Sequence, residues 1–197
     1  MAQYNLAPLS TIDQTYEQGM LPQRNDKSKF YKDTSGRCDL SNFSLSSENR
    51  RILRKTEQYT YQTIPLSSFE YTPAVQKQIY NWIKGLGWDF PISSVKTIFN
   101  SHIFNQLDVW YDGDKVIAYA ISYSSDHISH IAYVFYDPQY SHGDLPIRLV
   151  LQFVINSHDQ HLKYCYLGRF SDDVGYYKRN MPGFEHFQDG VWVKFKK

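Results

Sequence analysis

Two consecutive stretches of alternating apolar and polar residues constrain the fold of this chain more than any other feature. The segment LDVWYDGDKVIAYAISYS alternates on both sides of Asp112-Gly113, and Asp-Gly between alternating runs is a strong signal for a β-hairpin. The segment HISHIAYVFYDP follows the turn SSD and alternates in the same way. The sequence therefore predicts a hairpin followed by a third strand.

Helices are predicted on both sides of these strands. Thr72-Pro73 begins a pattern of apolar residues at helical spacing that stops at Gly87. Further helices are predicted from Val95 to Phe104 and from Leu145 to about Ser157. Two helices lead the chain, one with Ser10 and Asp13 at its start and Gly19 and Pro22 at its end, and one that begins at Ser46 or Ser47. The stretch LPQRNDKSKFYKDTSGRCD between them has too little periodicity for a prediction.

The order of the elements indicates the fold class. YTYQTIPL and KYCYLG are predicted strands, and Asp189-Gly190 precedes a last edge strand, VWVKFKK. Two helices, then strands, a helix, a strand, a short helix and a strand form the order of the N-acetyltransferase-like α/β fold. We therefore expect a mixed, mainly antiparallel sheet flanked by helices. Residues 1–57 are predicted to form a helical and loop segment packed on a main domain of residues 58–197.

Composition narrows the class of protein. A chain of 197 residues with 42% hydrophobic residues fits one soluble globular domain with a small extension. There is no apolar run of about 18 residues and no signal-peptide pattern, which favours a cytoplasmic protein. Cys38 and Cys165 form no CxxC pair, and the seven histidines show no ligand spacing. No metal site is predicted.

Positive charge is concentrated in the segment SSENRRILRK. The chain has a formal net charge of +1, so it would carry −3 without the four cations Arg50, Arg51, Arg54 and Lys55. Residues four apart share a helix face, which makes these side chains two adjacent rows on one surface. The segment is either a solvated helix face or a docking site for an anion.

Candidate site residues cluster at the end of the third strand and after it. Tyr136 and Asp137 end that strand, where a carboxylate can hold an amine, although Asp-Pro also opens turns. In the following YSHGDLPIRL, Gly143 permits close backbone approach, while Asp144 and Pro146 make the helix start a poor site for coenzyme A. The remaining predicted contacts are His142 and Gly168 for the donor and Tyr177, Lys178 and Arg179 for a nucleotide.

Several of these motifs together resemble one family. FSLSSENRRILRK, YVFYDP, LKYCYLG and YYK follow one another as in arginyl-tRNA-protein transferases. The likeness extends from Phe43 to about Asn180. The chain departs from that family in having no cysteine-rich module beyond Cys38, Pro146 where the family has glycine, and FSDDVG where the family has cysteine and lysine.

The resemblance implies an aminoacyl transfer from a charged tRNA to the α-amino group of a protein or peptide, with arginine as the candidate for the donor amino acid. It implies no cofactor and no membrane partner. Asp137 and Tyr136 would orient the amine, while the four basic residues of SSENRRILRK would bind tRNA phosphates or an acidic acceptor. Two alternatives remain open: a coenzyme A-dependent N-acyltransferase, and a domain that binds tRNA or an acidic peptide without chemistry.

Overall fold

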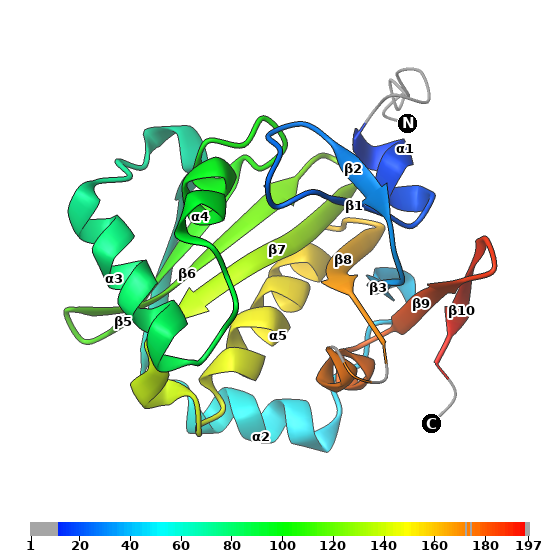
Figure 1. Ribbon diagram of the computed structural model, residues 1–197. Coiled ribbons are helices and arrows are strands. Elements are labelled where there is room, and N and C mark those ends of the chain that lie inside the picture. Colours follow the sequence, from blue (N-terminus) through cyan, green and yellow to red (C-terminus); the bar gives the residue numbers. More distant parts are fainter. Residues whose placement is uncertain (1–11, 172, 174, 196–197) are drawn as a thin grey trace.

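The computed structural model describes residues 12–171, 173 and 175–195, and most of them form two layers of helices around one mixed sheet (Figure 1). The sheet has eight strands in the order β10-β9-β3-β8-β7-β6-β5-β4. Its strands are β3 (Ser35–Asp39), β4 (Tyr59–Pro65), β5 (Gln106–Asp112), β6 (Lys115–Ser124), β7 (Ile128–Tyr136), β8 (Tyr164–Arg169), β9 (Phe184–Gln188) and β10 (Val191–Lys194). All neighbours are antiparallel except β7 and β8, which are parallel.

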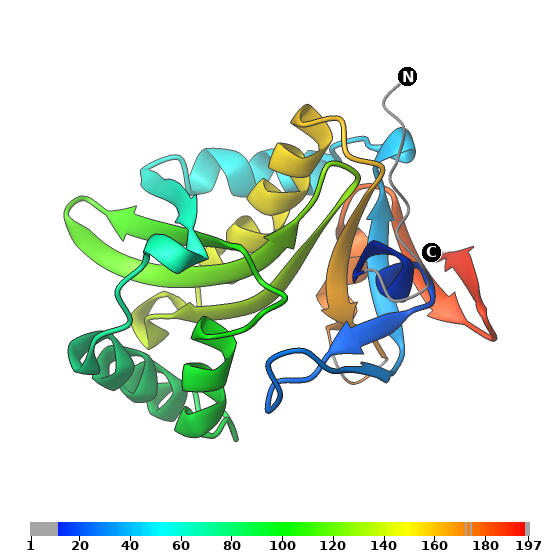
Figure 2. The same cartoon turned by 90° about the horizontal axis from the view of Figure 1, so that it is seen from above.

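The helices divide between the two faces of the sheet. The α-helices are α1 (Ile12–Glu17), α2 (Ser47–Lys55), α3 (Pro73–Gly85), α4 (Ile92–Phe99) and α5 (Leu145–Asp159). Short 3-10 helices are η1 (Leu40–Asn42), η2 (Leu66–Ser68), η3 (Pro138–Tyr140) and η4 (Tyr176–Asn180), and a separate two-stranded sheet pairs β1 (Met20–Pro22) with β2 (Phe30–Lys32). Helices α3 and α4 cover one face, while α5, with α2 beside it, covers the other (Figure 2). The predicted mixed α/β fold, with a mainly antiparallel sheet flanked by helices, is confirmed.

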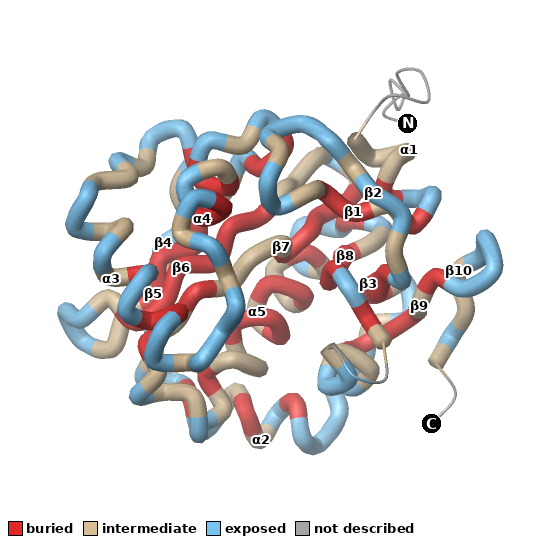
Figure 3. Tube along the Cα trace, in the orientation of Figure 1, coloured by how far each residue is buried: buried red, intermediate tan, exposed pale blue. Residues whose placement is uncertain are grey.

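The buried residues lie along the central strands and on the sides of the helices that pack against the sheet (Figure 3). On the α3–α4 face the core contains Ile79, Ile98 and Phe135, and on the α5 face it contains Leu151 and Val154. Both cores rest on β6 and β7, whose side chains alternate between the two faces. The central strands are therefore buried on both sides, which is why their apolar content is so high.

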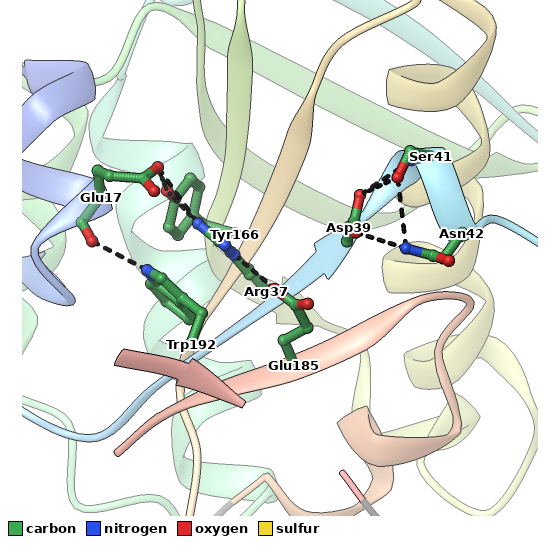
Figure 4. Close-up of polar contacts among 8 residues, drawn as sticks. All are labelled: Glu17, Arg37, Asp39, Ser41, Asn42, Tyr166, Glu185 and Trp192. Atoms are coloured by element: carbon green, nitrogen blue, oxygen red, sulfur yellow. Dashed lines mark hydrogen bonds and ion pairs between the residues drawn. The ribbon is translucent and has the colours of Figure 1, made fainter. Parts of the chain in front are cut away.

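Strand β3 enters the middle of the sheet from the first fifty residues of the chain. It is held there by Arg37, which lies between the rings of Tyr164 and Trp192, with its Cζ 3.5 and 4.1 Å from their centroids. Its Nε donates to Glu185 at 3.0 Å and its Nη1 to Glu17 at 3.2 Å (Figure 4). One buried cation thus links β3 to four other elements, and it satisfies the carboxylate of Glu185 on the adjacent strand β9.

Three sequence expectations need correction. The helix predicted for Val95–Phe104 is Ile92–Phe99, because Pro91 precedes its first turn and Asn100 ends it. The aperiodic stretch after Pro22 contains β2 and β3, and β3 is buried on both faces, so it never alternates. The strand Phe184–Gln188 was not predicted. Ser10, the predicted start of the first helix, lies outside the described residues, and the division at residue 57 stays a prediction.

Candidate active site

The two central parallel strands separate soon after they meet. Strands β7 and β8 pair only over Ile128–His130 and Tyr164–Tyr166, whereas β7 continues to Tyr136 and β8 to Arg169. Beyond the paired residues the two parts of the sheet diverge (Figure 2). Backbone groups on the facing edges of these strands are left without a strand partner, so they are available to a ligand.

A cleft of about 530 Å³ occupies the region where the strands diverge. Its walls come from β7, β8, the first turns of α5, the loop after α3, and the segment that contains η4. The lining residues are Trp88, Ile131, Ala132, Val134, Tyr136, Pro146, Ile147, Val150, Leu167, Gly175, Tyr177 and Lys178. The cleft is apolar over most of its surface, with two phenols and one amine among the described residues that line it. This composition is typical of a small-molecule site.

Lys178 supplies the amine of this cleft. Its Nζ donates a hydrogen bond to the Arg169 carbonyl oxygen at 2.7 Å. Gly175, with φ of +72°, lies against the lysine stem, and a Cβ there would come within 3.1 Å of Lys178 Cδ. Desolvation lowers the pKa of Lys178 to about 8. The amine can therefore exist in both protonation states near neutral pH, as a proton-transfer group requires.

The tyrosines flank this lysine. Tyr136 meets the ring of Trp88 edge-on, with centroids 5.6 Å apart. Tyr177 is 40% exposed as a whole, but desolvation of its hydroxyl, followed by the interaction with Tyr136, raises its pKa to about 12, so its phenol stays protonated. The sequence-predicted residues Tyr136, Tyr177 and Lys178 are thus brought together in one cleft, although their predicted roles stay predictions.

A buried histidine lies behind the cleft. His130 Nδ1 is 2.7 Å from the hydroxyl oxygen of Tyr16, while its Nε2 is buried without a hydrogen-bond partner among the described residues. A Cβ on Gly168, whose φ is +76°, would lie 3.4 Å from this Nε2 and 3.9 Å from Lys178 Nζ. Desolvation, with a smaller effect of Lys178, lowers the pKa of His130 to about 3. The imidazole is therefore neutral and packed behind the predicted donor-site residue Gly168.

Asp137 lies at the end of β7 but its carboxylate is already engaged. It accepts from the backbone N–H of Gln139 at 3.0 Å, which caps η3, and pairs with Lys115 Nζ at 2.7 Å. It is not among the described cleft-lining residues. These contacts match the turn-opening role that the Asp-Pro pattern allows. The predicted role of Asp137 in holding an amine stays a prediction.

The predicted basic segment is helix α2, and its cations differ in their contacts. Arg51 donates to Asp144 through both Nη atoms, at 2.9 Å each, and also pairs with Glu48. Arg50 donates to the Leu45 carbonyl. The neighbouring Arg54 and Lys55 are exposed. Arg51 therefore fastens α2 to the start of α5, and the exposed pair is better placed for an anion.

The remaining predicted residues lie beside the cleft lining. The Arg179 guanidinium stacks on Tyr176, with Cζ 3.4 Å from the ring centroid. His142 and Gly143 are exposed in the loop before α5. Sequence reasoning missed Trp88 and His130, because an isolated tryptophan after a helix and a histidine inside a strand carry no motif. Among the described residues, no cluster of three or more His, Cys, Asp or Glu side chains could hold a metal ion.

Comparisons with known proteins support the fold. A scan against protein-family models finds no match, and a search of curated proteins finds none either. Among solved structures, the C-terminal domain of a protein assigned as a lysylphosphatidylglycerol synthetase from Agrobacterium fabrum superposes with a TM-score of 0.53 and 13% identity. The match covers 83% of this chain and 60% of that one, so this chain spans less than two thirds of its neighbour.

Two further solved structures match with lower scores. One is L-PGS from Bacillus licheniformis, with a TM-score of 0.49, 14% identity, and coverage of 84% of this chain and 53% of that one. The other is a GCN5-related glucosamine N-acetyltransferase region of a fungal β-N-acetylglucosaminidase, with a TM-score of 0.49, 15% identity, and coverage of 80% and 20%. These scores are too low to place the fold.

None of the helices in the described part of the chain has the length and apolar character needed to cross a bilayer.

Proposed function

We propose that this chain is an acyltransferase that moves an aminoacyl group from a charged tRNA to an amine acceptor, with the chemistry in the cleft between β7 and β8. The observation that carries the proposal is the cleft itself, an apolar opening at the divergence of two central strands with Lys178 in its wall. The likeness of FYDP, YLG and YYK to arginyl-tRNA-protein transferases supports an aminoacyl donor. The name of the structural neighbour, lysylphosphatidylglycerol synthetase, also denotes an enzyme that attaches an aminoacyl group.

Lys178 is the group we assign to proton transfer. The neutral acceptor nitrogen bonds to the ester carbonyl carbon, the bond from that carbon to the ribose oxygen breaks, and the proton leaving nitrogen passes through Lys178 Nζ to the ribose oxygen. No covalent enzyme intermediate is needed, since positioning of the two substrates lowers the barrier. Tyr136 and Tyr177 line the same cleft and would contact the donor.

Charged tRNA pools test the proposal directly. The protein is incubated with tRNAs carrying labelled amino acids, together with peptides of varied N-terminal residue or with phosphatidylglycerol vesicles. Label in the peptide supports an amine acceptor, and label in the lipid supports the acceptor class of the structural neighbour. No transfer from any pool to any acceptor would refute the enzyme and favour the binding domain that the sequence left open.

The variant Lys178→Met tests the role of the lysine in proton transfer, with Lys77→Met as its matched control. We expect the rate to fall by about 10²-fold or more, because a general base contributes that much. Lys77→Met, on the exposed face of α3, should leave the rate unchanged. In the wild type the rate should rise as the pH passes through about 8, where Lys178 loses its proton. A rate that falls over that range would indicate that the protonated form of Lys178 is the active one.

A coenzyme A-dependent reaction is the second candidate. The same cleft position serves acyl donors in this fold class, but Pro146 lies in the first turn of α5, where it removes a backbone N–H that a pyrophosphate would use. Calorimetric titration with acetyl-coenzyme A separates the two candidates. Binding of acetyl-coenzyme A without binding of charged tRNA would favour this candidate.

A further inference from the structure

A second, smaller cavity lies under the C-terminal half of α5. It has a volume of about 100 Å³ and is bounded by β4, β5, β6, β7 and the last turns of the helix. The large cleft is lined by the first turns of α5, so the two spaces lie at opposite ends of that helix. Of the residues that line the smaller cavity, only Phe153 is apolar. A polar cavity inside a hydrophobic layer requires an occupant that can satisfy it.

Asp108 is the charged residue of this cavity. It projects from β5 toward α5 and is 4% exposed. Thr63 Oγ1 donates to its Oδ1 at 2.5 Å, and among the described residues no Lys, Arg or His forms an ion pair with it. Burial raises the pKa of Asp108 to about 6, so most of it is still ionised at about pH 7.5. An ionised carboxylate buried without a cation is strongly unfavourable.

The surroundings add acceptors and no positive charge. Ser129 Oγ lies 2.7 Å from Ser157 Oγ at the cavity wall, and the side chains of Gln106 and Ser124 line the same space. Ser157 lies in the last turn of α5, where the carbonyl end of the helix favours cations. Ser122, the cross-strand partner of the cavity-lining Gln106, has a buried hydroxyl with no hydrogen-bond partner among the described residues. Carboxylate, hydroxyl and amide oxygens are ligands for hard cations.

We propose that this cavity binds a monovalent cation, an alkali metal ion or a small ammonium group, with Asp108 as its charged ligand. A single carboxylate among neutral oxygens balances one positive charge, whereas protein sites for divalent ions generally use more carboxylates. The volume admits one such ion with its nearest waters. This site is independent of the proposed transfer reaction.

Thermal unfolding tests the site on the full chain at about pH 7.5. Chlorides of potassium, sodium, ammonium and methylammonium are compared at equal ionic strength with N-methylglucamine chloride, whose cation is too large for the cavity. At least one small cation should raise Tm by ~2–4 °C, because it binds only the folded state. Comparing the rise in Tm with the two metal chlorides and with the two ammonium chlorides shows whether the cavity prefers an alkali metal ion or an ammonium group.

Asp108→Asn should abolish the ion-specific rise in Tm. In N-methylglucamine the variant should be at least as stable as the wild type, because the uncompensated charge is gone. Asp126→Asn, which removes an exposed carboxylate, should keep the ion-specific rise. A wild type that treats all five cations alike, or an Asp108→Asn variant that still prefers a small cation, would overturn the proposal.

Calorimetry keeps the test decisive if Asp108→Asn does not fold. The wild-type protein is titrated with the cation that raised Tm most, in N-methylglucamine buffer. Saturable binding with about one ion per chain supports the site. Absence of saturable binding at the concentrations that shift Tm would contradict it.

Discussion

At the scale of single residues, Arg37 shows how one side chain determines where a strand lies. The change Arg37→Met would leave Glu185, which is 8% exposed, without its ion-pair partner. We expect the free energy of unfolding in urea to fall by ~3–5 kcal/mol, because a buried charge would lose its partner. Adding Glu185→Gln should restore part of that loss. Arg169→Met, which removes the more exposed pair with Asp33, should cost no more than ~1 kcal/mol.

His130 makes a second residue-scale prediction, on acid stability. Its pKa is about 3 in the folded protein because of burial, whereas an unfolded histidine titrates near ~6.5. Between these values the unfolded chain binds more protons, so stability is present above ~6.5 and is lost as the pH falls. We expect the free energy of unfolding to drop by about 2 kcal/mol from about pH 7 to pH 5 through this residue.

His130→Gln should reduce that acid loss, since glutamine keeps a hydrogen-bonding group for Tyr16 and does not titrate. His102→Gln, at an exposed position, serves as the control and should leave the pH dependence unchanged. Urea unfolding at several pH values measures both variants. Equal pH dependence in wild type and His130→Gln would show that the imidazole does not cause the acid loss.

At the scale of elements, helix α2 carries one cation that is held in an ion pair within the protein and two that are exposed to solvent. The exposed residues Arg54 and Lys55 should contact tRNA phosphates, whereas Arg51 is held by Asp144. Replacing Arg54 and Lys55 by Gln should weaken tRNA binding and lower the slope of log Kd against log salt by roughly one for each lost contact. The same change at Lys77 and Lys84 of α3 should leave the slope unaltered. An unaltered slope in the α2 variant would make the helix a solvated face.

Elements with a regular pattern could be predicted, and those without one could not. Helix α3 begins at Pro73 as expected, because Thr72 caps it and Val75, Ile79 and Trp82 repeat at helical spacing. Strand β3 could not be found, since its residues are buried on both faces and its main anchor is an arginine. The motif residues Tyr136, Tyr177 and Lys178 could be nominated from sequence. Trp88 and Gly175 depend on how distant segments pack, which a single sequence does not state.

At the scale of the whole molecule, the sheet consists of two parts joined by a short parallel contact. Three residue pairs connect β7 to β8, and the core clusters lie on both faces of the strands around them. A ligand in the cleft would contact both parts at once. Its binding should therefore stabilise the junction more than it stabilises the outer strands.

Hydrogen exchange measures this effect with a stable donor analogue, an adenosine that carries an amino acid through a 3′-amide. The backbone amides of the cleft-lining residues Ile131, Val134 and Leu167 should exchange about tenfold more slowly at an analogue concentration of ten times Kd. Val109, in β5 between two paired strands, should show little change. Lys178→Met should keep this protection if the lysine acts on the proton, because the cleft walls that hold the analogue are unchanged. Protection confined to α2 would instead place the donor outside the cleft and remove the basis for assigning proton transfer to Lys178.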